Sequence, residues 1–286
     1  MAPTTTANPR VAVITGASSG IGEATAVALA RKRYAVLLAA RRLEALRRVA
    51  AACGAAGAPH AEAVVTDVAD RRQVDALVSG AVDRFGRLDV MVNNAGRGLR
   101  ARVDETTDEQ MRSIFQVNYF GAFYGARAAA RVMIAQRSGH IFNVSSVIGK
   151  RGTPLNGAYC ATKFALCGLT ESMRVELKPF GVRVTSVCPT LTATEFFGAR
   201  EGGTPQSGRR FSRLRGLMPA ALVGRKIAAT VGKSTPELVF SPGGKTLALL
   251  AALSPRLTDA MMGVYYRQQK TDDVEAGRGQ GGVMKG

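Results

Sequence analysis

The sequence predicts an α/β fold, in which a doubly wound parallel sheet forms a single domain with helices on both faces. Two observations support this class. Short apolar runs alternate with longer amphipathic stretches along most of the 286 residues, and the apolar runs contain few polar residues. Such strands are typical of a parallel sheet that is buried on both faces, and right-handed crossovers between them give a doubly wound topology.

The expected strands are short runs rich in Val, Ile and Leu. In order they are Val11–Ile14, Ala35–Ala39, Ala63–Thr66, Val90–Val92, His140–Val144, Val182–Val187 and Leu238–Phe240. The stretches between them repeat apolar residues at helical spacing, which predicts helices. These are 21–33, 42–53, 70–86, 107–136, 158–179 and 219–232, followed by a helix-like apolar stretch at 245–267.

Three segments fall outside this alternation. Residues 1–9 and 271–286 are polar, so we expect a flexible terminus on each side of one domain over residues 10–270. Residues 190–218 are rich in Gly, Thr, Arg and Phe, and predict a long loop. We find no linker that would separate a second domain.

The formal net charge is +18. The arginines are spread over nearly every expected helix rather than gathered in one stripe, as shown by Arg31, Arg47, Arg71, Arg84, Arg112, Arg131 and Arg174. No helix-turn-helix, zinc-finger or RNA-binding aromatic signature accompanies them, so we expect a solvated surface and no nucleic-acid partner. A positive surface also favours anionic ligands such as a phosphorylated cofactor.

The four cysteines, Cys53, Cys160, Cys167 and Cys188, have neither metal-ligand spacing nor the pattern of a disulfide framework. We therefore expect a reduced, cytoplasmic protein without a metal site. The first ten residues lack the basic-then-apolar pattern of a signal peptide. The apolar run 247–253 is too short to cross a bilayer.

A glycine-rich turn follows the first expected strand, with Gly16, Gly20 and Gly22 just before a helix. Glycine lets the backbone turn tightly and approach a pyrophosphate, which the free N–H groups at the helix start can bind. In isolation such a turn is equally compatible with a structural role. Its place after the first strand of an α/β sheet favours a dinucleotide site.

The end of the second expected strand indicates which dinucleotide is bound. NAD-binding folds of this kind place a carboxylate there, which accepts a hydrogen bond from the ribose 2′-hydroxyl. This chain has Arg41 and Arg42 instead, and two guanidiniums are suited to a 2′-phosphate. The sequence therefore favours NADP(H), although both arginines are also compatible with the solvated start of a helix.

Several motifs occur together in a characteristic order and spacing. They are Thr15–Gly22, Asp67, Asn93–Gly96, Asn118, Asn143–Ser146, and Tyr159 with Lys163. With these motifs, residues 10–240 resemble the short-chain dehydrogenase/reductase family, whose domain is a Rossmann fold. The resemblance implies an NADP(H)-dependent oxidoreductase that transfers a hydride between the nicotinamide and a secondary alcohol or ketone.

The resemblance also implies a set of cofactor contacts. The glycine turn and the second strand contribute Gly16, Ser18, Ser19, Gly20, Ile21, Gly22, Arg41 and Arg42. The adenine would lie beside Asp67 and Val68, and the ribose beside Asn94, Ala95 and Gly96, with Tyr159 and Lys163 nearby. The carboxamide would meet Pro189, Thr192 and Thr194. The family usually has Pro-Gly where this chain has Pro189 and Thr190.

Tyr159 and Lys163 are four residues apart in a helical stretch, so both side chains project from one helix face. A lysine about 4–6 Å away favours the tyrosinate. The resemblance implies that Tyr159 is the acid/base, and that Lys163 also binds the nicotinamide ribose. It further implies that Asn118 anchors a water and that Ser146 orients the carbonyl. Ser145 should face the opposite side, because side chains alternate along a strand.

Apolar residues in 190–218 and 245–267 predict a hydrophobic substrate of steroid, retinoid or fatty-acyl type, or else pack in the core or at a subunit interface. The resemblance implies a homodimer or homotetramer, and peripheral membrane contact through the C-terminal stretch stays open. Two non-redox alternatives remain: a catalytically silent NADP-binding regulator and a basic membrane-surface protein. A Ser–His hydrolase is disfavoured, because His140 has no evident acidic partner.

Overall fold

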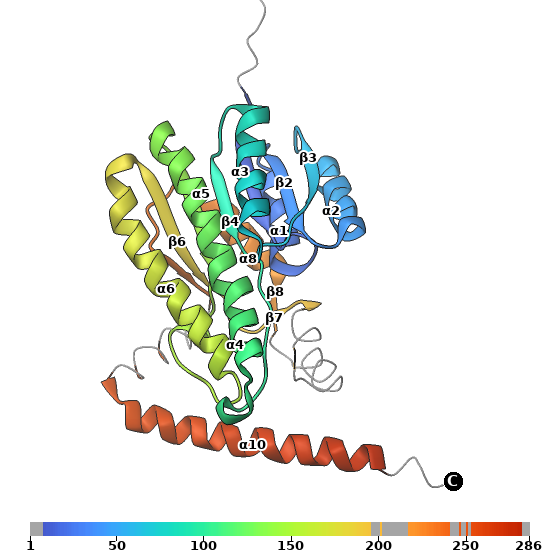
Figure 1. Ribbon diagram of the computed structural model, residues 1–286, viewed down its shortest axis with the longest axis vertical. Coiled ribbons are helices and arrows are strands. Elements are labelled where there is room, and N and C mark those ends of the chain that lie inside the picture. The colour runs from blue at the N-terminus through green and yellow to red at the C-terminus, as the bar shows by residue number, and fades with distance from the viewer. Residues whose placement is uncertain are drawn as a thin grey trace, which may run out of the picture.

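The computed structural model describes residues 8–195, 201, 217–240, 246, 250 and 253–281, and its centre is a seven-stranded sheet (Figure 1). The strands are β1 (Val11–Thr15), β2 (Ala35–Ala40), β3 (Ala61–Val65), β4 (Val90–Asn93), β5 (Gly139–Val144), β6 (Val182–Cys188) and β9 (Glu237–Val239). Their order is β3-β2-β1-β4-β5-β6-β9, and all neighbours are parallel. The predicted doubly wound fold is confirmed.

Helices cover both faces of this sheet (Figure 1). One layer contains α1 (Gly20–Ala30), α2 (Leu43–Ala55) and α8 (Ala220–Thr230). The other contains α3 (Arg71–Phe85), α5 (Gly121–Gln136) and α6 (Gly157–Leu177). Shorter 3₁₀ turns are η1 (Val103–Glu105), η3 (Val147–Gly149) and η4 (Lys178–Phe180).

The strands supply apolar side chains to both layers, because alternate residues point to opposite faces. From β1, Ala12 and Ile14 enter the first layer, and Val11 and Val13 enter the second; all four are fully buried. This explains why the strand sequences lack polar alternation.

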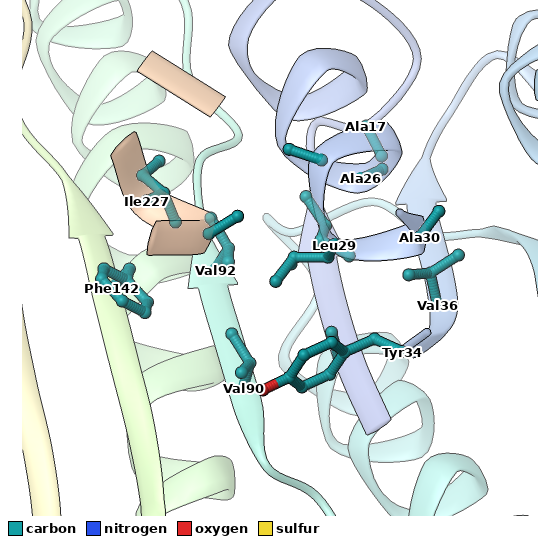
Figure 2. Packing of buried hydrophobic residues seen from close by; sticks show 14 of the residues in the cluster. Ala17, Ala26, Leu29, Ala30, Tyr34, Val36, Val90, Val92, Phe142 and Ile227 are labelled. Atoms are coloured by element: carbon teal, nitrogen blue, oxygen red, sulfur yellow. The ribbon is translucent and has the colours of Figure 1, made fainter. Parts of the chain in front are cut away.

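Figure 2 shows the first layer from close by. Leu29 of α1 and Ile227 of α8 belong to the same buried cluster as Val92 and Phe142 of the central strands. The layer therefore joins helices from both ends of the chain to the middle of the sheet, which fixes the strand ends that carry the polar motifs.

The expected helix 107–136 contains a break that the sequence pattern did not indicate. A π-helical turn, η2 (Gln116–Phe120), joins α4 (Asp108–Phe115) to α5. At the start of α5, Gly121 packs so closely that a Cβ there would lie 2.8 Å from Cγ2 of Val68. Such turns often occur at functional sites, and this one carries Asn118, which is fully buried.

Four other elements differ from expectation. β3 begins at Ala61, two residues before the predicted start. Within the predicted loop 190–218, β7 (Thr192–Ala193) pairs in parallel with β8 (Met218–Pro219). α10 (Pro255–Gly281) lies across one end of the molecule, so residues 271–281 are helical where we predicted a flexible tail (Figure 1). A polar composition argues against a packed core but does not by itself exclude a helix.

Parts of the predicted flexible and loop segments lie outside the described residues. These are 1–7 and 282–286 at the termini, and 196–200 and 202–216 within the predicted loop. In the described part of the chain, no helix combines the length and apolar character needed to cross a bilayer.

Candidate active site

A cavity of about 870 Å³ lies at the carboxyl ends of the central strands. In a doubly wound sheet, ligands bind at this edge, where the chain crosses from one face to the other. The cavity is lined by most of the predicted site residues: Gly16, Ser18, Ser19, Gly20, Ile21, Arg41, Arg42, Asp67, Val68, Asn94, Ala95, Gly96, Ser146, Tyr159, Lys163, Pro189, Thr192 and Thr194. Gly22 and Asn118 do not line it.

The glycine turn between β1 and α1 requires glycine for two different reasons. Gly16 and Gly20 have positive φ angles of 63° and 60°, a left-handed conformation that glycine adopts without strain. Gly22 instead allows close packing, because a Cβ there would lie 2.3 Å from the carbonyl oxygen of Gly16. The structure thus gives Gly22 a supporting role behind the cavity wall.

Asn94 and Thr15 fasten the glycine turn to the end of β4. The Asn94 side-chain amide donates to the carbonyl oxygens of Thr15 and Gly16, at 3.0 and 3.2 Å. The Thr15 hydroxyl accepts from the backbone N–H groups of Asn94 and Ala95, at 3.0 and 3.1 Å. Family resemblance had placed Asn94 beside the ribose; its contacts here show that it also supports the turn.

Positive charge gathers where β2 ends. Nη2 of Arg42 donates to the hydroxyls of Ser18 (3.1 Å) and Ser19 (3.0 Å). The same nitrogen lies 2.9 Å from a carboxylate oxygen of Glu195. Arg41 also lines the cavity. This end of the cavity is therefore suited to a phosphate group next to the glycine turn.

At the opposite end, α6 presents Tyr159 and Lys163 to the same cavity. Nζ of Lys163 lies 5.6 Å from the centroid of the Tyr159 ring and donates to the carbonyl oxygen of Val144 at 2.9 Å. Burial lowers the pKa of Lys163 to about 8. An amine with that pKa is still mostly protonated at neutral pH, and can release its proton near neutrality.

Asn118 lies behind Lys163 rather than in the cavity wall. Its Oδ1 accepts from the backbone N–H of Arg97 at 2.8 Å, and its Nδ2 donates to the Arg97 carbonyl and the Thr162 hydroxyl, at 2.9 and 3.2 Å. A Cβ on Gly96 would lie 3.2 Å from Oδ1 of Asn118 and 3.7 Å from Nζ of Lys163. Asn118 thus fixes the backbone that faces the lysine, and its expected contact with a water stays a prediction.

The two serines after β5 have different environments, as their alternation predicted. Ser146 is partly exposed in the cavity wall and its Oγ accepts from the N–H of Ile148 at 3.4 Å. The buried Ser145 hydroxyl donates to the carbonyl oxygen of Lys163 at 2.9 Å. Ser145 therefore anchors α6 at the position of the lysine, and Ser146 is the serine that can meet a ligand.

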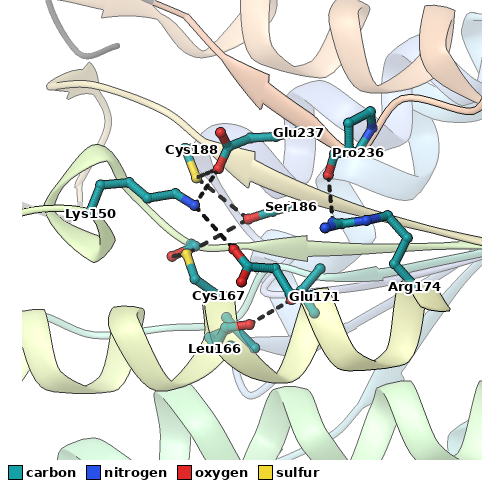
Figure 3. A network of polar contacts seen from close by, with 12 residues as sticks. Lys150, Leu166, Cys167, Glu171, Arg174, Ser186, Cys188, Pro236 and Glu237 are labelled. Atoms are coloured by element: carbon teal, nitrogen blue, oxygen red, sulfur yellow. Dashed lines mark hydrogen bonds and ion pairs between the residues drawn. The ribbon is translucent and has the colours of Figure 1, made fainter. Parts of the chain in front are cut away.

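A polar network behind Ser145, buried at Cys167 and exposed at Glu171, was not predicted (Figure 3). Sγ of Cys167 lies 3.2 Å from the Ser145 hydroxyl. Lys150, which follows η3, pairs with Glu237 of β9 at 2.9 Å and with Glu171 of α6 at 3.5 Å. The network holds the turn after Ser146 between α6 and the last strand. Cys167 is buried within it, in agreement with a packing role.

The end of the cavity beside Tyr159 is bordered by a mixed set of side chains. The Arg97 guanidinium pairs with Glu201, to which Gln110 donates at 3.0 Å. Leu191 and Tyr265 also line the cavity, the latter from α10. Of the apolar stretch 245–267, which we expected to contact a hydrophobic substrate, Tyr265 lines the cavity; Phe196 and Phe197 of the predicted loop 190–218 lie outside the described residues.

His140 has a structural environment away from the cavity. Its Nε2 lies 2.8 Å from the Thr185 hydroxyl, which itself donates to the carbonyl oxygen of Thr235. Its Nδ1 accepts from the N–H of Gly232 at 3.2 Å. This network fits a neutral imidazole with a proton on Nε2. Burial, with a contribution from Arg183, lowers the pKa of His140 to about 3, which disfavours the hydrolase alternative.

Among the described residues, no group of three His, Cys, Asp or Glu side chains is arranged to hold a metal ion. The four cysteines are all buried and none forms a disulfide.

Known proteins resemble this chain over most of its length. The family described as short chain dehydrogenase matches residues 10–203. An uncharacterized oxidoreductase of Staphylococcus aureus strain USA300 is 37% identical over 190 residues, which cover 66% of this chain and 81% of that protein.

Solved structures of similar fold hold both kinds of nicotinamide cofactor. A short-chain dehydrogenase/reductase of Burkholderia phymatum in complex with NAD has a TM-score of 0.80 at 29% identity, covering 88% of this chain and 96% of that one. An alcohol dehydrogenase of the archaeon Thermococcus sibiricus, complexed with 5-hydroxy-NADP, has a TM-score of 0.71 at 29% identity, covering 81% and 95%. The fold therefore binds a nicotinamide dinucleotide.

Proposed function

This chain belongs to the short-chain dehydrogenase/reductase family of oxidoreductases, and from that premise we propose that it is an NADP(H)-dependent enzyme acting on a secondary alcohol or ketone. The observation that carries the proposal is the position of Tyr159 and Lys163. Tyr159, Lys163 and the glycine turn all line one cavity. The Lys163 ammonium group lies 5.6 Å from the centroid of the Tyr159 ring.

The residues around the cavity fit a dinucleotide. The turn from Gly16 to Gly20 leaves backbone N–H groups at the start of α1, where a pyrophosphate is stabilised. Arg41 and Arg42 stand at the end of β2, where a carboxylate would favour NAD(H). They support NADP(H) as the preferred cofactor, because guanidinium groups bind phosphate oxygens.

When bound, the nicotinamide would supply or accept the hydride, and this chain would correspondingly supply or accept the proton. In the reducing direction, the Tyr159 hydroxyl donates its proton to the substrate oxygen. The Lys163 ammonium stabilises the resulting tyrosinate, because opposite charges about 4–6 Å apart favour the ionised phenol. Ser146 donates a hydrogen bond that orients and polarises the carbonyl. Asn118 holds the backbone of Arg97 close to the lysine.

The substrate class is proposed on the nature of the cavity wall. Leu191, Ile148 and Tyr265 supply apolar surface to the lining, while Arg97 and Glu201 neutralise each other. These features support a hydrophobic alcohol or ketone of the steroid, retinoid or fatty-acyl type.

Assembly and location are also part of the proposal. Exposed aromatic side chains on η2 and α6, Phe120 and Phe164, support a homodimer or homotetramer through these helices. The four free thiols support a reducing, cytoplasmic location.

Cofactor preference is tested by thermal unfolding of the full chain in the presence of NADPH or NADH. A ligand that binds only the folded state stabilises it by RT ln(1 + [L]/Kd), so at equal concentrations we expect the larger rise in Tm with NADPH. A larger rise with NADH would show that Arg41 and Arg42 do not select the cofactor.

Catalysis is tested with a panel of carbonyl compounds and NADPH, followed by Tyr159→Phe on any compound that is turned over. We expect Tyr159→Phe to abolish turnover while NADPH still raises Tm, because the phenol proton is lost but the cavity is kept. Tyr119→Phe, which removes a hydroxyl outside the cavity lining, is the control. Turnover by Tyr159→Phe would refute its role, and a panel without any turnover would favour a silent NADP-binding regulator.

A further inference from the structure

We propose that Glu195 limits the affinity of this protein for NADP(H) by competing with the cofactor's 2′-phosphate for Arg42. This inference rests on the proposed NADP(H) function, and it names a specificity-determining residue of the same site. Glu195 lies in the predicted loop 190–218, which the sequence did not connect with cofactor selection.

The residue before Glu195 packs against the glycine turn. Thr194 packs onto the turn so closely that a Cβ on Gly20 would lie 2.8 Å from Cγ2 of Thr194. One residue later, Oε2 of Glu195 lies 2.9 Å from Nη2 of Arg42. Residues 190–195 run along the cavity, and Thr192, Thr194 and Glu195 all line it. This path of the backbone places the Glu195 carboxylate beside Arg42.

Three acceptors meet at the same guanidinium nitrogen. Nη2 of Arg42 donates to the hydroxyls of Ser18 and Ser19, which are neutral, and contacts Glu195, which is an anion. The hydrogen bond from Arg42, despite an opposing effect of desolvation, lowers the pKa of Glu195, with a smaller contribution from Ser19. The carboxylate is therefore ionised at neutral pH, and it accepts the Arg42 hydrogen bond that a phosphate oxygen of the ligand would otherwise accept.

Two anions cannot share one guanidinium without repulsion. A ligand with a 2′-phosphate must displace the carboxylate or approach it, whereas a ligand with a 2′-hydroxyl leaves the pair intact. Both side chains are more than half exposed, at 55% for Arg42 and 64% for Glu195, and exposed ion pairs are weak. We therefore expect removal of the carboxylate charge to strengthen binding of the phosphorylated ligand by about two- to fivefold.

The test measures binding of adenosine 2′,5′-bisphosphate and adenosine 5′-monophosphate to the full chain by isothermal titration calorimetry. These ligands differ only in the 2′-phosphate, and their binding requires no turnover. Glu195→Gln should bind the bisphosphate about two- to fivefold more tightly than the wild type does, with an unchanged Kd for the monophosphate. Added salt should reduce the difference.

Glu44→Gln is the matched control. It removes one carboxylate from the start of α2, where Glu44 pairs with Arg47 at 2.7 Å rather than with Arg42. It should leave both Kd values unchanged. An equal gain in Glu44→Gln and Glu195→Gln would overturn the proposal, because it would show a general effect of net charge.

The remaining outcomes separate this inference from the cofactor preference. If the wild type prefers the bisphosphate and Glu195→Gln leaves that preference unchanged, the competition is refuted while NADP(H) stands. If only Glu195→Gln prefers the bisphosphate, the competition is supported and the wild-type preference for NADP(H) is wrong. If neither prefers it and the two proteins bind the bisphosphate equally tightly, both proposals are refuted.

Discussion

Replacing Lys163 by methionine tests the electrostatic basis of the proposed chemistry. The substitution removes a buried ammonium group and keeps an unbranched side chain of similar length. The phenol of Tyr159 then loses its nearest positive charge in α6, whose distance from the ring centroid is 5.6 Å. Removal of a positive neighbour raises the pKa of a phenol, because the tyrosinate is no longer stabilised.

The expected size of the effect follows from this distance. At an effective dielectric constant of about 20, two unit charges 5.6 Å apart interact by roughly 3 kcal/mol. One pKa unit corresponds to about 1.36 kcal/mol, so the phenol pKa should rise by about 2. Alcohol oxidation requires the tyrosinate. It should therefore fall about 100-fold at neutral pH and recover toward higher pH.

The assay is the pH profile of kcat/KM for alcohol oxidation at saturating NADP⁺, with an alcohol found in the substrate panel. The acidic limb of the profile should move to higher pH by about 2 in Lys163→Met. Lys150→Met is the control, because that lysine pairs with Glu237 and Glu171 behind the site. It should lower Tm without moving the limb. A uniform loss of rate at every pH would refute the electrostatic role and leave Lys163 a binding residue.

Two further predictions concern the support of the site. Gly149→Ala places a Cβ 2.7 Å from the Ser145 hydroxyl and 2.8 Å from the Lys163 carbonyl, so it should lower the free energy of unfolding in urea by about 1–3 kcal/mol. The control Gly152→Ala, with no atom within 4 Å of its Cβ, should lower it far less. Equal decreases in the two variants would contradict the role of the Gly149 contact. Because the folded-state pKa of His140 is about 3, the unfolded chain binds its proton first as pH falls below ~6.5, so the wild type should lose roughly 2 kcal/mol by pH 5. His140→Gln should lack this slope, and an identical slope would show that other groups cause it.

The fold was predictable because a buried parallel sheet leaves a strong mark on its sequence. Val11–Thr15 contributes side chains to both helical layers, so every position of the strand is apolar or small. Strand bounds are predicted less accurately where fewer of the strand's side chains are buried. β3 is mostly half-buried and its start was placed two residues late. The two-residue strands β7 and β8 are too short to carry any periodic pattern.

The site was predictable where one element holds several functional groups. Tyr159 and Lys163 lie one turn apart on α6, and the spacing alone places them on one face. Contacts between distant segments leave no such mark. Lys150, after η3, pairs with Glu237 of β9. Glu195 pairs with Arg42 beside the glycine turn. Nothing in the sequence around any of these residues indicates its partner.

The hydrogen bonds that Thr15 and Asn94 make around the glycine turn affect the kinetics of ligand association. Four hydrogen bonds hold the glycine turn in its final shape before any dinucleotide arrives. The entropy of ordering this turn is therefore lost when the chain folds, and association does not have to wait for a rare open conformer. Encounter with an anionic dinucleotide should then depend mainly on long-range attraction to a chain of net charge +18, and its rate should slow as ionic strength rises.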